Sequence, residues 1–318
     1  MTEDLEERLE PTTGTFFCSL DSLARAESLT GTAPRAGVWL LLEYNGAWGE
    51  KAFPESDLPE AVKEHLNAGL ETLTGSRLLL IKSRPGILAP GLRFYFAVAR
   101  EHDPRLYAFD LAGYEDLLGL DFSEILAGSP AYARHLQSGP LFLVCTNGRR
   151  DACCAKYGLP VYMELLKSVE ETPENQQVWQ STHVGGHRFA PNLGLFPHGL
   201  FYGRVEAQDA PALVEAYRQG EMRLEGLRGR STYPEHVQAA EVFLRRETGE
   251  AGVSAYRLVD VAAEGPDLWR VGFQENLSGR RHTVRVRLQR YEQEVYVSCR
   301  RDKTEPLTGY RLVSYREE

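Results

Sequence analysis

Two stretches of the chain show the same succession of hydrophobic and polar positions. Residues 37–44 form an apolar run that predicts a buried strand, and Asn45-Gly46 ends this run. Residues 58–73 follow with apolar side chains three or four positions apart, the spacing of a helix with one buried face. The rest of this first unit is predicted as three strands and a short helix, at residues 77–83, 93–100, 106–111 and 123–127.

The second stretch repeats this order about 102 residues further along. A strand at residues 140–146 ends at Asn147-Gly148, and a helix is predicted at residues 151–169, with Pro160 kinking or splitting it. Three strands and a helix complete the unit, at residues 178–184, 192–197, 200–205 and 211–218. A β-α-β crossover, a β-hairpin and a packing helix make up the skeleton of a thioredoxin-like fold. We therefore predict an α/β fold, α+β overall, with two thioredoxin-like units in tandem.

The pattern changes after a Gly- and Arg-rich joint at residues 224–232. Pro234 opens a helix, and residues 281–289 then alternate apolar with basic or polar side chains, as in a half-buried strand with a basic outer face. Further strands are predicted at residues 257–262, 267–273 and 293–299. This region is predicted to form a small antiparallel α+β module. The predicted domains are residues 1–132, 133–224 and 225–318.

Composition and charge exclude some classes of partner. The 318 residues are 42% apolar and 25% charged, as in an ordinary globular protein, and the net charge of −9 argues against nucleic acid or an anionic membrane as the main partner. The acidic N-terminus lacks the features of a signal or transit peptide, and no apolar run approaches the ~18 residues that span a bilayer. We expect a cytoplasmic protein.

The five cysteines are read as free thiols or ligands, because their number is odd and their density is low. Cys145 ends the first strand of the second unit, and Cys154 lies in the first turn of the following helix, where free amide groups favour a thiolate. His183 and His187 stand in the loop after the next strand. In the predicted topology, these four side chains converge near one end of the sheet.

A set of two cysteines and two histidines is compatible with three kinds of site. They can bind zinc, they can hold a [2Fe–2S] cluster with mixed ligands, or the thiols can cycle through a disulfide without a metal. The Cys-x8-Cys loop is wide for a structural zinc site, while Gly185-Gly186 would let backbone amides approach bridging sulfides closely. Spacing alone leaves zinc and iron–sulfur open.

The sequence also carries a family resemblance. The segment "CTNGRRDACCAKYG" followed by "STHVGGHRFAPN" and "FYGRV" closely resembles the sucrase/ferredoxin-like family, whose members are thioredoxin-like [2Fe–2S] ferredoxins. Residues 29–49 also resemble the N-terminal segment of that family, so the resemblance covers roughly residues 15–225.

The resemblance implies that Cys145, Cys154, His183 and His187 ligate a [2Fe–2S] cluster. It favours a one-electron carrier that works with a redox partner protein over an enzyme, and no pair of carboxylates has a defensible glycosidase geometry. A zinc-stabilised or thiol-based thioredoxin-like protein is the alternative.

Residues beside the ligands have two interpretations each. Arg149 and Arg188 can hydrogen-bond a cluster sulfide, raise its potential or dock a partner, or they can form surface salt bridges. Cys153 is predicted to be a spare thiol that faces the core. Cys18 and Cys299 are predicted to be small buried hydrophobic side chains.

Overall fold

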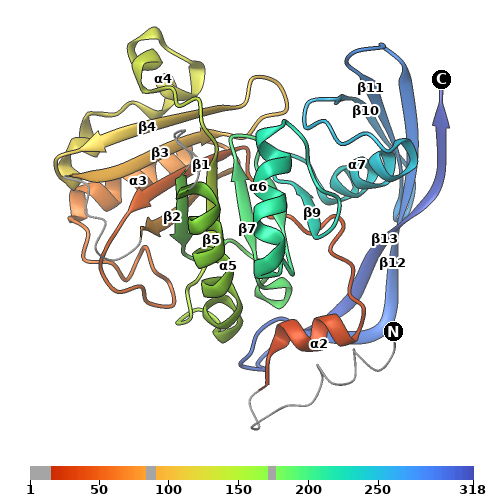
Figure 1. Cartoon of the computed structure of the whole chain (residues 1–318), viewed down its shortest axis with the longest axis horizontal. Coiled ribbons are helices and arrows are strands. Elements are labelled where there is room, and N and C mark those ends of the chain that lie inside the picture. Colours follow the sequence, from red (N-terminus) through yellow and green to blue (C-terminus); the bar gives the residue numbers. More distant parts are fainter. Residues whose placement is uncertain (1–15, 84–90, 171–176) are drawn as a thin grey trace.

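The computed structural model describes residues 16–83, 91–170 and 177–318 (Figure 1). Its main element is a nine-stranded sheet that contains strands from both predicted units. In spatial order, the strands are β4 (Arg105–Leu111), β3 (Leu92–Val98), β1 (Val38–Glu43), β2 (Ser76–Lys82), β6 (Gln177–Ser181), β5 (Leu141–Cys145), β7 (Leu193–Phe196), β8 (Leu200–Tyr202) and β9 (Leu227–Arg230).

The first eight strands of this sheet contain the same arrangement twice. In the first half, β1 is parallel to β2 and antiparallel to β3, and in the second half β5 is parallel to β6 and antiparallel to β7. The halves meet where β2 and β6 pair antiparallel, through Ile81 with Ser181 and Lys82 with Gln180. The strand order therefore reads the same from either end, which confirms the predicted pair of thioredoxin-like units.

Helices cover the outer face of the sheet. Leu40 and Leu42 of β1 pack with α3 (Glu60–Thr72), and Phe142 and Val144 of β5 pack with α5 (Ala152–Glu170). Pro160 lies inside α5, which runs without a break. The other helices of the two halves are α4 (Phe122–Ala127), α6 (Ala210–Arg218) and the 3-10 turns η1 (Tyr114–Gly119), η2 (Pro130–His135), η3 (His187–Phe189) and η4 (Ala207–Asp209).

The inner face of the sheet packs against itself, because the sheet curls. The ring of Trp39 in β1 lies 5.6 Å from that of Phe196 and 5.1 Å from that of Phe201, and Tyr95 in β3 lies 5.8 Å from Trp179 in β6. Aromatic pairs of this kind contribute about 0.5–1.5 kcal/mol each beyond their buried area. The two halves therefore share one hydrophobic core on this side.

A second, four-stranded antiparallel sheet follows, packed on α7 (Glu235–Thr248). Its strands are β10 (Tyr256–Gly265), β11 (Leu268–Glu275), β12 (Arg281–Tyr296) and β13 (Thr304–Glu317). His282, Val284 and Val286 point inward, so the predicted alternation is confirmed.

Three details of the C-terminal region differ from the sequence prediction. Residues 281–289 and 293–299 were predicted as two strands, but β12 runs through both to Tyr296 and pairs with the unpredicted β13. A register shift between Arg290 and Glu294 lies where the two predicted strands would have met. The joint at residues 224–232 contains β9, the buried edge strand of the large sheet.

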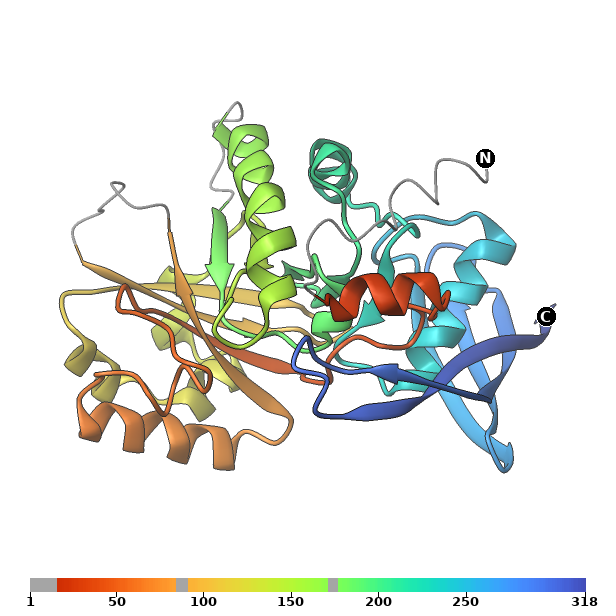
Figure 2. The same ribbon diagram turned by 90° about the horizontal axis from the view of Figure 1, so that it is seen from below.

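The β12–β13 hairpin extends beyond its own sheet. Figures 1 and 2 show its far end beside α2 (Cys18–Ala24). The ring of Phe16 lies 5.1 Å from that of Tyr296, and the guanidinium of Arg301 lies over Phe16. The tip of the hairpin thus packs on the N-terminal segment beside the second unit.

The predicted domain boundaries, after residues 132 and 224, stay predictions. Hydrogen bonds between β2 and β6 cross the first boundary, and those between β8 and β9 cross the second. In the described ranges, no helix is long and apolar enough to cross a bilayer. The expected cytoplasmic location stays a prediction.

A buried ion-pair network fixes β9 to α7. Glu241 receives hydrogen bonds from Arg230 at 2.9 Å and from Arg245 at 3.1 Å, and all three side chains are at most 5% exposed. Burial alone would raise the pKa of Glu241, but the two guanidinium groups outweigh it and lower the pKa to about 2. The carboxylate is therefore ionised at neutral pH.

Replacing Glu241 with glutamine should lower the free energy of unfolding by about 3 kcal/mol, because two buried arginines lose their anionic partner. Glu247→Gln, an exposed position on the same helix, is the control and should change stability by less than about 0.5 kcal/mol. Urea denaturation at neutral pH measures both. Equal effects of the two substitutions would contradict the importance of this network.

Candidate metal centre

The four predicted ligands lie together at the carboxyl ends of β5 and β6. Cys145 is the last residue of β5, Cys154 lies in the first turn of α5, His183 follows β6 and His187 opens η3. Donor atoms of Cys145, Cys154 and His183 all lie within 4.8 Å of one another. The rings of His183 and His187 are 4.7 Å apart and tilted by 33°. Two thiols and one imidazole thus form one group of donors, and the ring of His187 lies against the ring of His183.

The two thiols share a hydrogen bond in the interior. Cys145 is 1% exposed and Cys154 is 0% exposed. The hydrogen bond with Cys154 lowers the pKa of Cys145 well below its usual value, against the effect of burial, and His183 adds to this. The same hydrogen bond and burial raise the pKa of Cys154. The pair therefore carries one negative charge readily, and a second only if a cation compensates it.

The two histidines offer unpaired ring nitrogens. Nδ1 of His183 and Nδ1 of His187 are both buried, and neither has a hydrogen-bond partner among the described residues. Buried polar atoms without a partner are rare in proteins and costly. Burial lowers the pKa of His187 to about 4, so its imidazole is neutral at pH 7, which is the form that binds a metal. The donor set therefore fits a metal group bound by two sulfurs and two nitrogens.

A buried arginine supports the histidine loop. Arg228 of β9 donates to the carbonyl oxygen of Gly185 at 2.9 Å and to Oδ1 of Asn192 at 2.8 Å, and it also donates to the hydroxyl and carbonyl oxygens of Thr32. The side chain is only 2% exposed, and burial lowers its pKa to about 9. A fixed cation therefore lies directly beneath the segment that carries both histidines.

The paired glycines fit around this arginine. Gly185 and Gly186 have φ values of +106° and +74°, which disfavour other residues. A Cβ on Gly186 would lie 2.5 Å from Nη2 of Arg228 and 2.9 Å from the ring of Phe189. From the sequence, these glycines were expected to let backbone amides approach bridging sulfides. In the structure, Gly186 is required because a side chain there would collide with Arg228 and Phe189.

Side-chain caps fix the start of α5 and hence Cys154. Oδ1 of Asn147 accepts hydrogen bonds from the backbone N–H groups of Arg149 and Arg150, at 3.2 and 3.3 Å. Asp151 precedes the helix, and its Oδ1 accepts from the N–H of Cys153 at 3.0 Å, as an N-cap residue does. The turn after β5 is thereby held in one conformation.

The two predicted arginines lie in different environments. Arg188 donates to Glu27 at 2.8 Å and to Glu305 at 3.4 Å, so it forms the ion pairs that were one of its two interpretations. Arg149 is exposed, and within the described ranges its side chain forms no ion pair. A role of either arginine at a bound cluster stays a prediction.

Sequence reasoning missed Arg228 and the surroundings of three cysteines. Arg228 was assigned to a linker, since the alternation of glycine and arginine in residues 226–230 looks like a flexible, solvated segment. Cys18 and Cys153 are buried as predicted, but their sulfurs contact each other and Cys299, so the surroundings are not purely apolar. The clue available in the sequence was the acidic residue Asp151, two positions before Cys153.

The fold is that of a thioredoxin-like protein, and the donor atoms of Cys145, Cys154 and His183 lie together at the end of its second unit. The model of the family described as sucrase/ferredoxin-like matches residues 29–229, and the chain belongs to this family. The match covers both thioredoxin-like units and β9 up to Gly229, which includes Arg228.

Similar proteins include yeast proteins named "Altered inheritance of mitochondria protein 32". The chain is 33% identical over 95 residues to that of Meyerozyma guilliermondii and 30% identical over 80 residues to that of Debaryomyces hansenii. These matches cover 28% and 24% of this chain, and only 34% and 29% of the relatives' own lengths. The Candida glabrata protein is 20% identical over 238 residues, which are 63% of this chain and 74% of the relative.

Among solved structures, a thioredoxin-like [2Fe–2S] ferredoxin from Aquifex aeolicus is similar at 17% identity, with a TM-score of 0.28. That match covers 30% of this chain and 94% of the ferredoxin.

Close packing behind Cys145 depends on Gly158 of α5. A Cβ at this position would lie 2.3 Å from the carbonyl oxygen of Cys145. Alanine normally stabilises a helix by about 1 kcal/mol over glycine, but overpacking against backbone costs about 1–3 kcal/mol. Gly158→Ala should therefore lack this gain and lower the stability measured by chemical denaturation, by up to about 2 kcal/mol.

Gly119→Ala is the matched control, because a Cβ there meets no atom within 4 Å. It should leave stability within about 0.5 kcal/mol of the parent protein. A Gly158→Ala variant as stable as the parent would show that α5 does not press on β5 at the centre.

Proposed function

We propose that the protein transfers single electrons and that Cys145, Cys154, His183 and His187 hold a [2Fe–2S] cluster. The observation that carries this proposal is the pair of buried, unpaired Nδ1 atoms of His183 and His187 beside two buried thiols. When bound, such a cluster accepts and releases one electron, and histidine ligation raises its potential above that of an all-cysteine cluster.

The surrounding side chains suit this task. The thiol pair faces the shared inner core, which excludes water, while the histidine side of the centre is only partly buried, His187 being 12% exposed. The cation of Arg228 beneath the loop offsets negative charge on the thiolates without reaching solvent. Electrons would therefore pass through the imidazole side, where a redox partner protein can approach.

The ring of His187 also has a place for a proton. Its Nε2 lies 4.0 Å from Oδ2 of Asp151. If Nδ1 is the ligand atom, Nε2 holds the proton that faces this carboxylate. Loss of that proton on oxidation would make the potential fall as pH rises.

The first test is the composition and spectrum of the protein from anaerobic, iron-replete expression. We expect a red-brown protein with about two iron atoms per chain and a reducible EPR signal. Cys145→Ser should remove the iron. A colourless preparation without iron would contradict the proposal and favour the zinc-stabilised or thiol-based alternative.

Replacing His187 with cysteine tests the histidine ligand. The cluster should persist with a potential lower by about 100 mV or more, since thiolate donates more negative charge than imidazole, and the pH dependence should weaken. Protein-film voltammetry between pH 6 and about 10 measures both quantities. His198→Asn is the control, because His198 lies in the turn between β7 and β8 and bonds Tyr217. An unchanged potential in His187→Cys would remove His187 from the ligand set.

The positioning role of Arg228 is tested by Arg228→Lys. Lysine keeps the charge but cannot make the forked contacts to Gly185 and Asn192, so loss of the cluster to a chelator should become about tenfold faster, equivalent to one charge-assisted hydrogen bond of about 1.5 kcal/mol. Arg223→Lys, a partly exposed position, should not change this rate. Equal rates in both variants would mean that Arg228 does not hold the loop.

A further inference from the structure

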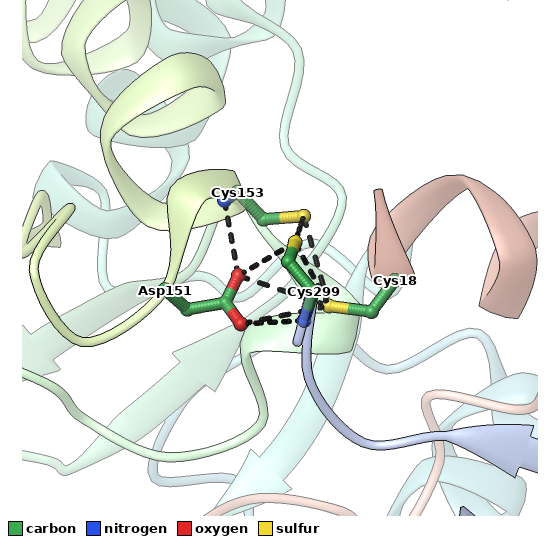
Figure 3. Close-up of side chains that lie close together, drawn as sticks. All are labelled: Cys18, Asp151, Cys153 and Cys299. Atoms are coloured by element: carbon green, nitrogen blue, oxygen red, sulfur yellow. Dashed lines mark hydrogen bonds between the residues drawn. The ribbon is translucent and has the colours of Figure 1, made fainter. Parts of the chain in front are cut away.

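Three thiols from distant parts of the chain meet outside the Cys2His2 centre. Figure 3 shows Cys18 of α2, Cys153 of α5 and Cys299 of the loop after β12 pointing toward one another. Their sulfurs are 3.7 Å apart for Cys18 and Cys153, 3.7 Å for Cys18 and Cys299, and 3.2 Å for Cys153 and Cys299. Each sulfur therefore has both others as neighbours.

A carboxylate completes the group. Oδ1 of Asp151 lies 3.0 Å from the sulfur of Cys299 and 3.8 Å from that of Cys18. Backbone N–H groups of Cys153 and Cys299 hold this carboxylate, at 3.0 and 2.9 Å. One donor atom from each of the four residues lies within 4.8 Å of every other. Cys18 and Cys153 are 0% exposed and Asp151 is 4% exposed.

These separations suit ligands around one metal ion. A tetrahedral zinc ion with sulfur ligands at about 2.3 Å sets neighbouring sulfurs about 3.8 Å apart, close to the spacing of Cys18 from its two neighbours. A disulfide needs its two sulfurs at about 2.05 Å. All five cysteines of the chain are free, and the third thiol and the carboxylate would have no function in a simple disulfide pair.

The negative charge of Asp151 is not compensated by a nearby lysine or arginine among the described residues. Within the described part of the chain, Asp151 has no lysine or arginine partner, and its closest basic group is the imidazole of His187 at 4.0 Å. The nearby cations are engaged elsewhere: Arg300 pairs with Glu50, and Lys156 and Arg301 lie over aromatic rings. A buried carboxylate and three thiols can all ionise only if a cation joins them.

We propose that Cys18, Cys153, Cys299 and Asp151 bind one thiophilic divalent cation, of which zinc is the type. Cysteine thiolates and a carboxylate oxygen are a donor set that zinc accepts in tetrahedral sites. This second site goes beyond the electron-transfer function and does not depend on the cluster, since the two donor sets have no residue in common.

The site would clamp three segments together. The ligands stand at the start of α2, at the start of α5 and in the β12–β13 loop. Cys18 is 133 residues from Asp151 and 281 residues from Cys299 in the sequence. Cys153 directly precedes the proposed cluster ligand Cys154, and Asp151 lies beside His187. The metal would therefore hold α2 and the long hairpin over the Cys2His2 centre, which gives the C-terminal module a structural task.

Metal analysis of the full chain tests this directly. The purified protein should contain about one zinc per chain in addition to its iron. Cys18→Ser and Cys299→Ser should lose most of the zinc and keep the iron, whereas Cys145→Ser should lose the iron and keep the zinc. Ser298→Ala, in the same loop but outside the donor set, is the matched control and should keep both metals.

The outcomes separate the two proposals. If Cys18→Ser or Cys299→Ser loses its iron, the second site is not independent of the cluster, and the proposal is overturned. If both variants keep their zinc, these cysteines do not bind it, and the proposal is also overturned. A protein without iron that still binds zinc through Cys18 and Cys299 would contradict the proposed [2Fe–2S] cluster and leave the proposed zinc site standing. A disulfide among these three cysteines, detected by mass spectrometry after anaerobic purification, would also overturn the proposal.

A measurement on the unaltered protein guards against variants that fail to fold. Cys299 is the one partly exposed thiol of the group, so metal binding should protect it from alkylation. Added Co²⁺ should protect Cys299 in zinc-depleted protein and produce the strong visible bands of a tetrahedral thiolate site. Labelling of Cys299 that is the same with and without Co²⁺ would count against a site there.

Discussion

The contact between Arg228 and the loop of residues 183–187 is the interaction on which the rest of the site depends. This loop is short and contains two glycines with positive φ, so its own backbone does not fix the histidines. Hydrogen bonds from the guanidinium to Gly185, Asn192 and Thr32 hold it against β9 and the N-terminal segment. A buried cation is costly, and it is tolerated here because carbonyl, amide and hydroxyl oxygens surround it and the thiolate of Cys145 lies nearby.

The two halves of the duplicated architecture differ at the position where the second half carries Cys145. Glu43 occupies, at the end of β1, the position that Cys145 occupies at the end of β5. Its carboxylate accepts from Asn45 and from the backbone N–H of Arg93, so it serves strand pairing in the first half. The first half supplies the other wall of the shared inner core, and with it the dry surroundings of the cysteine pair.

Local pattern predicted the two units well, because the strand–helix–hairpin order depends on side-chain periodicity that is written in each segment. The closeness of Cys145, Cys154 and His183 followed from topology, since strand ends at one edge of a sheet lie together. Arg228 and the thiol group of Cys18, Cys153 and Cys299 did not follow. They join segments up to 281 residues apart, and neither periodicity nor motif spacing encodes such contacts. The strand β13 was missed because charged residues interrupt its apolar positions.

The most direct test of the account is pulsed EPR of the reduced protein with histidine labelled by ¹⁵N. Ligation of the cluster by His183 and His187 predicts two strongly coupled nitrogens, one of which disappears when either histidine is replaced by cysteine. A reduced cluster with no strongly coupled nitrogen would contradict the account, because the buried Nδ1 atoms would then have no metal to bind.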